Sequence, residues 1–381
     1  MWRQFDVHRN VFRPYLGLWN WGFFPHSNRE LAKRIPLAKR NFAQIMRRQI
    51  DPYRNFEITK RDGTARLISA PTNKIKGLQK AILKNYLSDP ALTHPNAFAY
   101  VKGKSAVQAA RVHDSAKWAV KIDIVNFFGS IDEKQIYWTL LSMKATSYQS
   151  FVLARVLTRL ERSQDELPKS IAENYGEMET PQHKKYLKVQ RHHLGKKFGV
   201  ARRRVGFLPQ GAPTSGQVSN LVCFDIDIAL TSLASEYGCR YTRYADDIIF
   251  SSSSDFSRQV AEEIMLRASS VLVRNGFELH KKKSRIIGPG SKLQILGLLA
   301  DAPGLRLPPE KKKKIDAELR AIEKFGFSSH AEFLEQHYLK VLNRLFGYLV
   351  WASQVEPKWA HANLIKLRQL SDLEIKPGFR G

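Results

Sequence analysis

Cysteine is scarce in this chain of 381 residues, which contains only Cys223 and Cys239. Two cysteines exclude a disulfide framework and a cysteine-rich zinc site. Both lie in apolar surroundings, and although they could pair with each other, we expect buried free thiols. Free thiols fit a reducing cytosol.

Long apolar runs are also missing. No stretch approaches the roughly 18 residues that a membrane-spanning helix needs. The first residues, Met1 to Phe5, lack the apolar segment of a signal peptide. There is no internal repeat and no low-complexity linker. We therefore expect a cytoplasmic protein with no membrane partner.

Acidic residues are few compared with basic ones. The chain has 62 Lys and Arg against 35 Asp and Glu, a formal charge of +27. Such an excess predicts a polyanionic partner, nucleic acid first. A hydrophobic content of 43% excludes a disordered basic tail. The length permits a large core divided into two or three subdomains.

The stretch Tyr244-Ala245-Asp246-Asp247 carries the strongest chemical signal. Aromatic and β-branched residues on both sides predict a strand, a tight turn and a second strand. Adjacent carboxylates repel, and each raises the pKa of the other unless a cation lies between them. Such oxygen ligands suit Mg²⁺, which usually binds through one or two carboxylates plus substrate phosphates. The alternative is a solvated turn, where Asp is common.

A third acid interrupts the apolar strand predicted over residues 118–124. A carboxylate such as Asp123 is costly in a buried strand unless it is paired or bound to metal. Two neighbouring antiparallel strands could bring Asp123 beside Asp246 and Asp247. Two-metal phosphoryl transfer needs this arrangement, in which one metal activates the attacking hydroxyl and the other holds the triphosphate.

Residues 53–70 alternate on both sides of Asp62-Gly63, which predicts a β-hairpin. Its cations Lys60, Arg61 and Arg66 could bind a triphosphate, because a planar guanidinium can bond two phosphate oxygens at once. The alternative is a solvated hairpin with ordinary surface cations.

A turn-rich loop over 208–216 leads into an apolar helix predicted over 218–233. Gln210 in this loop could hydrogen-bond to a base pair or a sugar, or the loop could serve only as the helix entry. His113, at the end of a helix predicted over 107–113, is interpreted as a polar helix-end residue rather than a ligand. Further helices are expected over 148–160, after a cap within 252–255, and from 310 onward. A strand is expected over 277–280, and a hairpin around Gly297.

Two segments have unusual composition. Residues 1–45 mix aromatic and basic side chains, and we favour packing against the body over stacking on bases. Residues 163–204 are polar and then rich in Lys, Arg and His, which predicts an insertion with mobile or nucleic-acid-contacting parts. Its histidines do not indicate zinc, because cysteines and helical His spacing are missing.

Taken together, these segments resemble reverse transcriptases over residues 53–300. Within that family, Gln210 to Ser215 and Tyr244 to Asp247 are most similar to bacterial retron enzymes. The chain departs from the family at Gly216, where proline is usual, and at Ile295-Leu296, where Val-Thr is usual. The other pieces that carry the resemblance are Arg66 to Pro71, Asp123 to Phe128, Leu208 to Asn220, Gly276 to Ser284 and Leu296-Gly297.

The resemblance implies an α+β fold: a right-hand polymerase with fingers, a palm of antiparallel sheet plus helices, and a helical thumb. The implied boundaries are 1–45 for an N-terminal extension, 46–117 for fingers, 118–162 for the first part of the palm, 163–206 for the basic insertion, 207–302 for the palm with its hairpin, and 303–381 for the thumb.

The resemblance also implies roles for individual residues. Two Mg²⁺ ions, with Mn²⁺ as an alternative, would be held by Asp123, Asp246, Asp247 and the backbone of Ile124. The nucleotide (dNTP) would contact Lys60, Arg66, Gln210 and Phe128, the last as the gate that excludes a 2′-hydroxyl. Lys283 would protonate the leaving pyrophosphate, and Tyr244 and Gly297 would contact primer and template.

The implied function is that of a retron RNA-directed DNA polymerase. Such an enzyme copies part of its own structured non-coding RNA into single-stranded DNA and leaves a branched RNA–DNA molecule. The resemblance further implies a separate effector protein in anti-phage defence. One alternative is another defence-associated or group II intron-like reverse transcriptase. Another is a non-catalytic RNA-binding scaffold, against which the three intact acids speak.

Overall fold

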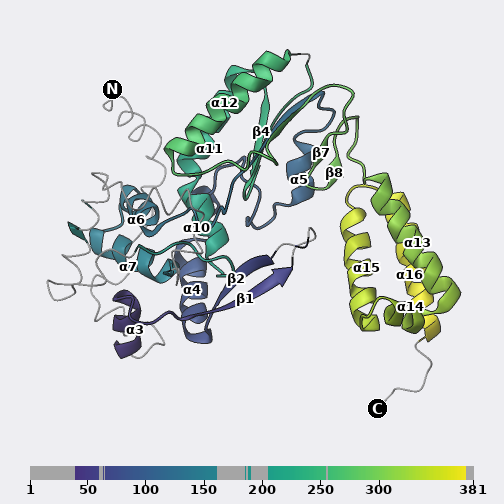
Figure 1. The fold of residues 1–381 in the computed structure, drawn as a ribbon, viewed down its shortest axis with the longest axis horizontal. Helices are drawn as coiled ribbons and strands as arrows, with labels where there is room; N and C mark the ends of the chain where they lie inside the picture. The colour runs from purple at the N-terminus through teal and green to yellow at the C-terminus, as the bar shows by residue number, and fades with distance from the viewer. Residues whose placement is uncertain are drawn as a thin grey trace.

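A computed structural model describes residues 39–59, 63, 65–160, 185, 188–189, 205–254 and 256–374 (Figure 1). The predictions made for residues 1–38, for nearly all of 161–204, and for Lys60 and Arg61 lie outside the described residues. Helices and antiparallel sheets are both present, and the α+β fold with fingers, palm and helical thumb is confirmed.

The palm is a four-stranded antiparallel sheet in the order β4-β5-β3-β6. Its strands are β3 (Trp118–Asp123), β4 (Arg240–Tyr244), β5 (Asp247–Ser252) and β6 (Arg285–Ile287). Strand β3 pairs with β5 from Trp118 opposite Ser252 to Asp123 opposite Asp247. Because side chains alternate along a strand, this register decides which residues share a face.

One face of the palm sheet is covered by helices. Val120 and Ile122 of β3 and Ile248 and Phe250 of β5 are fully buried in the main core. The covering helices are α11 (Phe224–Glu236), which follows α10 (Ser215–Val222), and α12 (Arg258–Arg274) (Figure 1). In each strand the apolar residues that alternate along the chain pack against these helices, and the residues between them lie on the opposite face of the sheet.

The opposite face carries Ala119 and Ile249, which belong to a second core. This core is completed by the short hairpin β7 (Gln294–Ile295) and β8 (Leu298–Leu299), by α5 (Ala106–Arg111) and by the end of a thumb helix. Lys121, Asp123 and Asp247 lie on the same face by register. The acids are thus on the face away from the covering helices.

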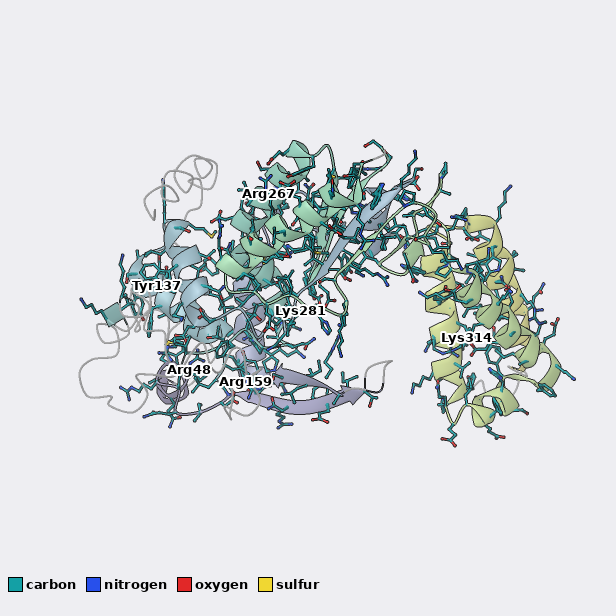
Figure 2. All side chains as sticks on the ribbon, turned by 45° about the horizontal axis from the view of Figure 1, so that its top comes forward. Arg48, Tyr137, Arg159, Arg267, Lys281 and Lys314 are labelled. Atoms are coloured by element: carbon teal, nitrogen blue, oxygen red, sulfur yellow. The ribbon has the colours of Figure 1, made fainter. Side chains whose placement is uncertain are left out.

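The fingers contain the hairpin β1 (Tyr53–Thr59) and β2 (Ala65–Pro71), as predicted around Gly63. They also include α3 (Lys39–Met46), α4 (Asn73–Tyr86) and the 3₁₀ turn η3 (Pro90–Leu92). Helices α6 (Glu133–Ser142) and α7 (Ser147–Leu157) each begin with a capping box. Arg159 binds Asp51 and Ser69 at the base of the hairpin (Figure 2).

The thumb consists of α13 (Pro309–Phe325), α14 (Phe327–Phe333), α15 (Tyr338–Ala352) and α16 (Pro357–Glu374). Ile315, Leu319, Val341 and Leu345 lie in its own core, so the bundle has an internal apolar centre. Its helices stand beside the β7–β8 hairpin, with α15 on the side that faces the fingers (Figure 1).

Several local predictions are wrong. The helix expected over 218–233 is two helices, α10 and α11, bent by 54° around Cys223. The cap of α12 is Ser257, which accepts from the Val260 amide, rather than a residue within 252–255. Residues 277–280 form only an isolated bridge, between Leu279 and Ile124, and not a strand.

Among the described residues, no single helix has both the length and the apolar character needed to cross a membrane. The bent pair α10–α11 meets that test by length and composition together.

Candidate active site

The catalytic candidates meet where β3 ends and β5 begins. Asp123, the last residue of β3, lies directly opposite Asp247, the first residue of β5. Asp246 occupies the turn between β4 and β5, and the amide of Ile124 donates to its carbonyl oxygen at 3.3 Å. Ala245 has φ of +56°, so the backbone turns sharply just before the acids. The structure thus pairs Asp123 with Asp247 on neighbouring antiparallel strands, with Asp246 in the adjoining turn.

A buried ion pair supports this turn from the helix side of the sheet. Arg243 donates to both carboxylate oxygens of Asp227 on α11 at 2.7 Å, and both side chains are almost fully buried. The Tyr241 hydroxyl donates to the same carboxylate at 2.7 Å. Arg243 also reaches the carbonyl oxygen of Ala245 at 3.4 Å. Bidentate guanidinium–carboxylate geometry is specific in direction, so it fixes the strand that leads into the acids.

His113 supports the same strands from the opposite face and is not the polar helix-end residue that was predicted. Its side chain is completely buried. Nδ1 lies 2.6 Å from the Ser251 hydroxyl on β5, and Nε2 lies 2.7 Å from the Thr242 hydroxyl on β4. Burial, with a smaller effect of Arg240, lowers the pKa of His113 from 6.5 to about 3. The neutral ring therefore links strands β4 and β5, between which Asp246 lies.

The charges around the acids favour a cation. Burial raises the pKa of Asp246, and the carboxylates of Asp247 and Asp123 raise it further. The Lys121 ammonium lies 3.0 Å from Asp247, and the Lys283 ammonium lies 3.5 Å from Asp123. These two lysines partly neutralise three carboxylates that repel one another. Figure 2 shows Lys281, from the loop that carries Lys283, on the side of the palm that faces the β1–β2 hairpin.

The donor set fits Mg²⁺ bound together with a substrate. In the part of the chain that the structure describes, no three His, Cys, Asp or Glu side chains are close enough to form a complete metal site. Mg²⁺ does not need one, because it usually combines one or two carboxylates with water and substrate phosphates. Asp123 and Asp247 lie opposite each other on paired strands, and each carboxylate is close to one lysine ammonium group, Lys283 and Lys121 respectively. If these lysine side chains moved away, the carboxylate oxygens would be free to bind a metal.

Three of the predicted nucleotide residues, Arg66, Gln210 and Phe128, lie in the described part of the chain, and Lys60 does not. The amide of Ser69 on β2 donates to the carbonyl of Gln210 at 2.7 Å, which joins the 208–216 loop to the fingers hairpin. Gly211 allows this approach, because a Cβ there would lie 3.0 Å or less from Ser69 and Ile68. Arg66 is exposed on β2, opposite Ile58. The partly buried Phe128 packs against Phe127, just after the β3 acid.

A cavity of about 550 Å³ adjoins the acids on the thumb side. Lys121 and Asp247 form its palm wall, while Tyr348 and Trp351 come from α15. Gly297, the predicted primer-contacting residue, lines it beside Lys311, which donates to the Gly297 carbonyl at 3.4 Å. Gly297 has φ of +85°, a conformation that favours glycine. Tyr244, the other residue predicted to contact primer or template, lies opposite Asp247 on β4. This thumb-side cavity is therefore cationic, aromatic and open to Asp247.

Sequence reasoning missed three residues of this site: Lys121, Asp227 and Tyr100, whose ring centroid lies 5.9 Å from that of Phe128. Lys121 precedes Asp123 by two residues, so strand alternation alone places it on the same face. Asp227 lies within the apolar stretch predicted as a helix, which is the same signal that drew attention to Asp123. No sequence signal distinguishes Tyr100.

The comparisons with known proteins agree with this architecture. The sequence profile of the family described as reverse transcriptase (RNA-dependent DNA polymerase) matches residues 58–300. This range holds the fingers hairpin, the palm sheet and the β7–β8 hairpin, and it covers well over half of the chain. The chain belongs to the reverse transcriptase family.

Several curated relatives of the chain are retron enzymes. The Retron Mx162 reverse transcriptase of Myxococcus xanthus is 28% identical over 330 residues, which cover 84% of this chain and 61% of the relative. The Retron Mx65 enzyme of the same organism is 27% identical, covering 82% and 64%. The Retron Ec86 reverse transcriptase of Escherichia coli is 26% identical, covering 86% and 82%. The predicted resemblance to retron reverse transcriptases is confirmed, and the chain spans somewhat less than two thirds of the two Myxococcus enzymes.

Among solved structures, apo telomerase from Candida tropicalis has a TM-score of 0.43 at 10% identity, covering 84% of this chain and 56% of that one. A superposition this loose adds nothing to the assignment.

Proposed function

We propose that this chain is an RNA-directed DNA polymerase of the retron type. The observation that carries the proposal is the pairing of Asp123 with Asp247, with Asp246 in the adjoining turn, beside a cationic cavity between palm and thumb. Phosphoryl transfer needs carboxylates that bind divalent cations next to a surface that binds polyanions. Membership of the reverse transcriptase family and the retron relatives support the choice of reaction.

In this proposal Asp123, Asp246, Asp247 and the Ile124 carbonyl hold two Mg²⁺ ions, or Mn²⁺ in their place. The bound metals supply activation of the primer hydroxyl and charge neutralisation on the triphosphate. Lys283, 3.5 Å from Asp123 in the described state, carries a proton on Nζ that can pass to the leaving pyrophosphate.

The incoming dNTP lies between the fingers hairpin and the palm. Arg66 on β2, with Lys60, binds the triphosphate, since guanidinium and ammonium groups favour phosphate oxygens. Gln210 supports the nucleotide from the loop joined to β2 by the Ser69 hydrogen bond. Phe128 packs against the deoxyribose and leaves no room for a 2′-hydroxyl.

The growing end of the DNA and its RNA template lie on the thumb side. Lys121, Arg285 and Lys311 converge on the cavity beside Asp247, where they can neutralise backbone phosphates. Gly297 brings the β7–β8 backbone close to the primer, and Tyr244 lies next to the acids. The net charge of +27 suits a long hybrid.

Primer extension tests the catalytic assignment. Purified protein with an RNA template, a DNA primer, dNTPs and Mg²⁺ is expected to extend the primer. Asp246→Asn and Asp247→Asn should abolish extension, because each removes a metal-binding charge. Glu262→Gln on the exposed surface of α12 is a matched control that removes one charge away from the site. Extension by either Asp variant at the rate of this control would refute the assignment.

The retron assignment has its own test. We propose that the chain copies part of a cognate structured RNA into a branched RNA–DNA molecule, and that it works with a separate effector protein against phage. Nucleic acid that copurifies from cells should contain one short DNA joined to one RNA species. Heterogeneous DNA from many templates would instead favour another defence-associated or group II intron-like enzyme. Loss of phage protection in cells that carry Asp246→Asn or Asp247→Asn would support the defensive role.

A further inference from the structure

Tyr100 adopts an unusual conformation for an aromatic residue. Its φ is +62°, in the left-handed region that bulky side chains rarely occupy. Its side chain is 53% exposed, although large aromatic rings are usually buried. A strained residue with an exposed ring points to a function when the surrounding structure holds it in place.

The backbone before Tyr100 is fixed on both sides by buried residues of the palm. The amide of Phe98 donates to the carbonyl of Arg243 at 2.9 Å, and the amide of Arg243 donates to the carbonyl of Asn96 at 2.9 Å. The side-chain amide of Asn220 on α10 donates to the carbonyl of Ala99 at 2.8 Å. These bonds tie the segment to the strand that leads into the catalytic acids.

The ring of Tyr100 lies against α10 and Phe128. A Cβ added to Gly216 would lie less than 3.0 Å from Cβ, Cγ and Cδ1 of Tyr100, so only glycine leaves room for the ring. The ring centroid is 5.9 Å from that of Phe128, at an interplanar angle of 55°. Tilted aromatic pairs at this separation attract each other beyond the effect of buried area.

The electrostatics of Tyr100 link it to Asp246 and to Arg66. Partial burial raises the pKa of Tyr100, and the carboxylate of Asp246 raises it further, while Arg66 opposes this. Tyr100 therefore interacts electrostatically with Asp246, the acid of the palm proposed to bind metal, and with Arg66, the cation of the fingers proposed to bind phosphate.

We propose that Tyr100 is a specificity-determining residue that supports Phe128 from behind and so sets the selection of deoxyribose over ribose. The proposal rests on the polymerase function proposed above. Phe128 can exclude a 2′-hydroxyl only if its ring cannot retreat. Tyr100 fills the space into which the ring would move, and Gly216 is the position that allows Tyr100 to be there.

Single-nucleotide incorporation of dGTP and GTP opposite one template cytosine tests this. Tyr100→Ala should lower the ratio of kcat/KM for dGTP over GTP by about tenfold, the upper end of what an aromatic pair contributes. Phe128→Ala should lower it further. Because both residues act through the same ring, Tyr100→Ala should have no added effect on the ratio in the Phe128→Ala background. An independent, additive effect would overturn the proposal, as would an unchanged ratio in the single variant.

Gly216→Ala provides a second route that leaves Tyr100 in the sequence. The added methyl group should displace the ring and reproduce the lowered ratio. Gly77→Ala on α4 is the matched control, since a Cβ there meets nothing within 4 Å.

Tyr100→Phe keeps the ring and removes only the hydroxyl. If this variant lowered the ratio of kcat/KM for dGTP over GTP as much as Tyr100→Ala does, the effect would belong to the hydroxyl and the proposal would be overturned. If the unaltered chain incorporates no dGTP, the polymerase function itself fails. If it incorporates dGTP and the ratio does not respond, only the role of Tyr100 fails.

Discussion

Acidification should weaken the fold through His113. The ring is completely buried and bonded to Thr242 and Ser251 on the two strands of the catalytic hairpin. Burial lowers its pKa from 6.5 to about 3. The unfolded chain therefore binds a proton at a higher pH than the folded one. The stability that His113 contributes is complete above about pH 6.5 and is lost as the pH falls toward about 3.

The size of this effect follows from the two pKa values. Between about pH 6 and pH 4 the unfolded state binds almost one more proton than the folded state, which costs about 1.4 kcal/mol for each pH unit. From about pH 7 to about pH 5 the loss from this residue is about 2 kcal/mol.

Urea unfolding of the unaltered chain and of His113→Gln would measure this loss. The variant has no titrating ring, so the other histidines and the acids contribute equally to both proteins. Near pH 7 the variant should be less stable, because the two buried hydroxyls lose a partner. The gap between the two free energies of unfolding should shrink by about 2 kcal/mol on going to about pH 5. A gap that stays constant over this range would refute the argument that burial keeps His113 neutral.

Three further predictions concern charge. Arg243→Met should lower the free energy of unfolding by about 3–5 kcal/mol, because it leaves the Asp227 carboxylate buried without a positive countercharge, with only the Tyr241 hydroxyl bonded to it. Arg267→Met, which breaks an exposed pair, should cost much less than Arg243→Met, and equal losses in denaturant unfolding would contradict this. Lys311→Gln should weaken binding of an RNA–DNA hybrid and reduce the slope of log K against log salt by about 1. Fluorescence anisotropy over a series of salt concentrations measures this slope, and an unaltered slope would contradict phosphate binding in the thumb-side cavity. Chelation of divalent cations should stop primer extension, and Mg²⁺ or Mn²⁺ should restore it; extension that persists in EDTA would contradict metal binding at Asp123.

The convergence of the acids could be predicted because it depends on local patterns. Alternation along β3 assigns Val120 and Ile122 to one face and Asp123 to the other, whatever the rest of the chain does. The tight turn before Asp246 follows from the residues beside it. The α+β fold was predicted from the resemblance, which such motifs carry, and the palm, the fingers hairpin and the thumb are all present.

Other features depend on distant parts of the chain and leave no local trace. The partners of His113 are 138 and 129 residues away in sequence, so its burial could not be seen beside it. The bend at Cys223 divides a stretch in which both halves are apolar on average, so composition does not mark it. Tyr100 owes its conformation to Arg243, Asn220 and Gly216, none of which is near it in sequence. Tertiary contacts decided these positions.

The pairing of β3 with β5 affects when the site can form during synthesis of the chain. The two strands that face each other at the acids are separated in sequence by α6, α7, α10, α11, β4 and the stretch between α7 and α10. A chain still on the ribosome, synthesised only as far as α11, has made Asp123 but not the strand opposite it. If the chain has the function proposed above, such a nascent chain lacks the paired acids and cannot yet copy RNA.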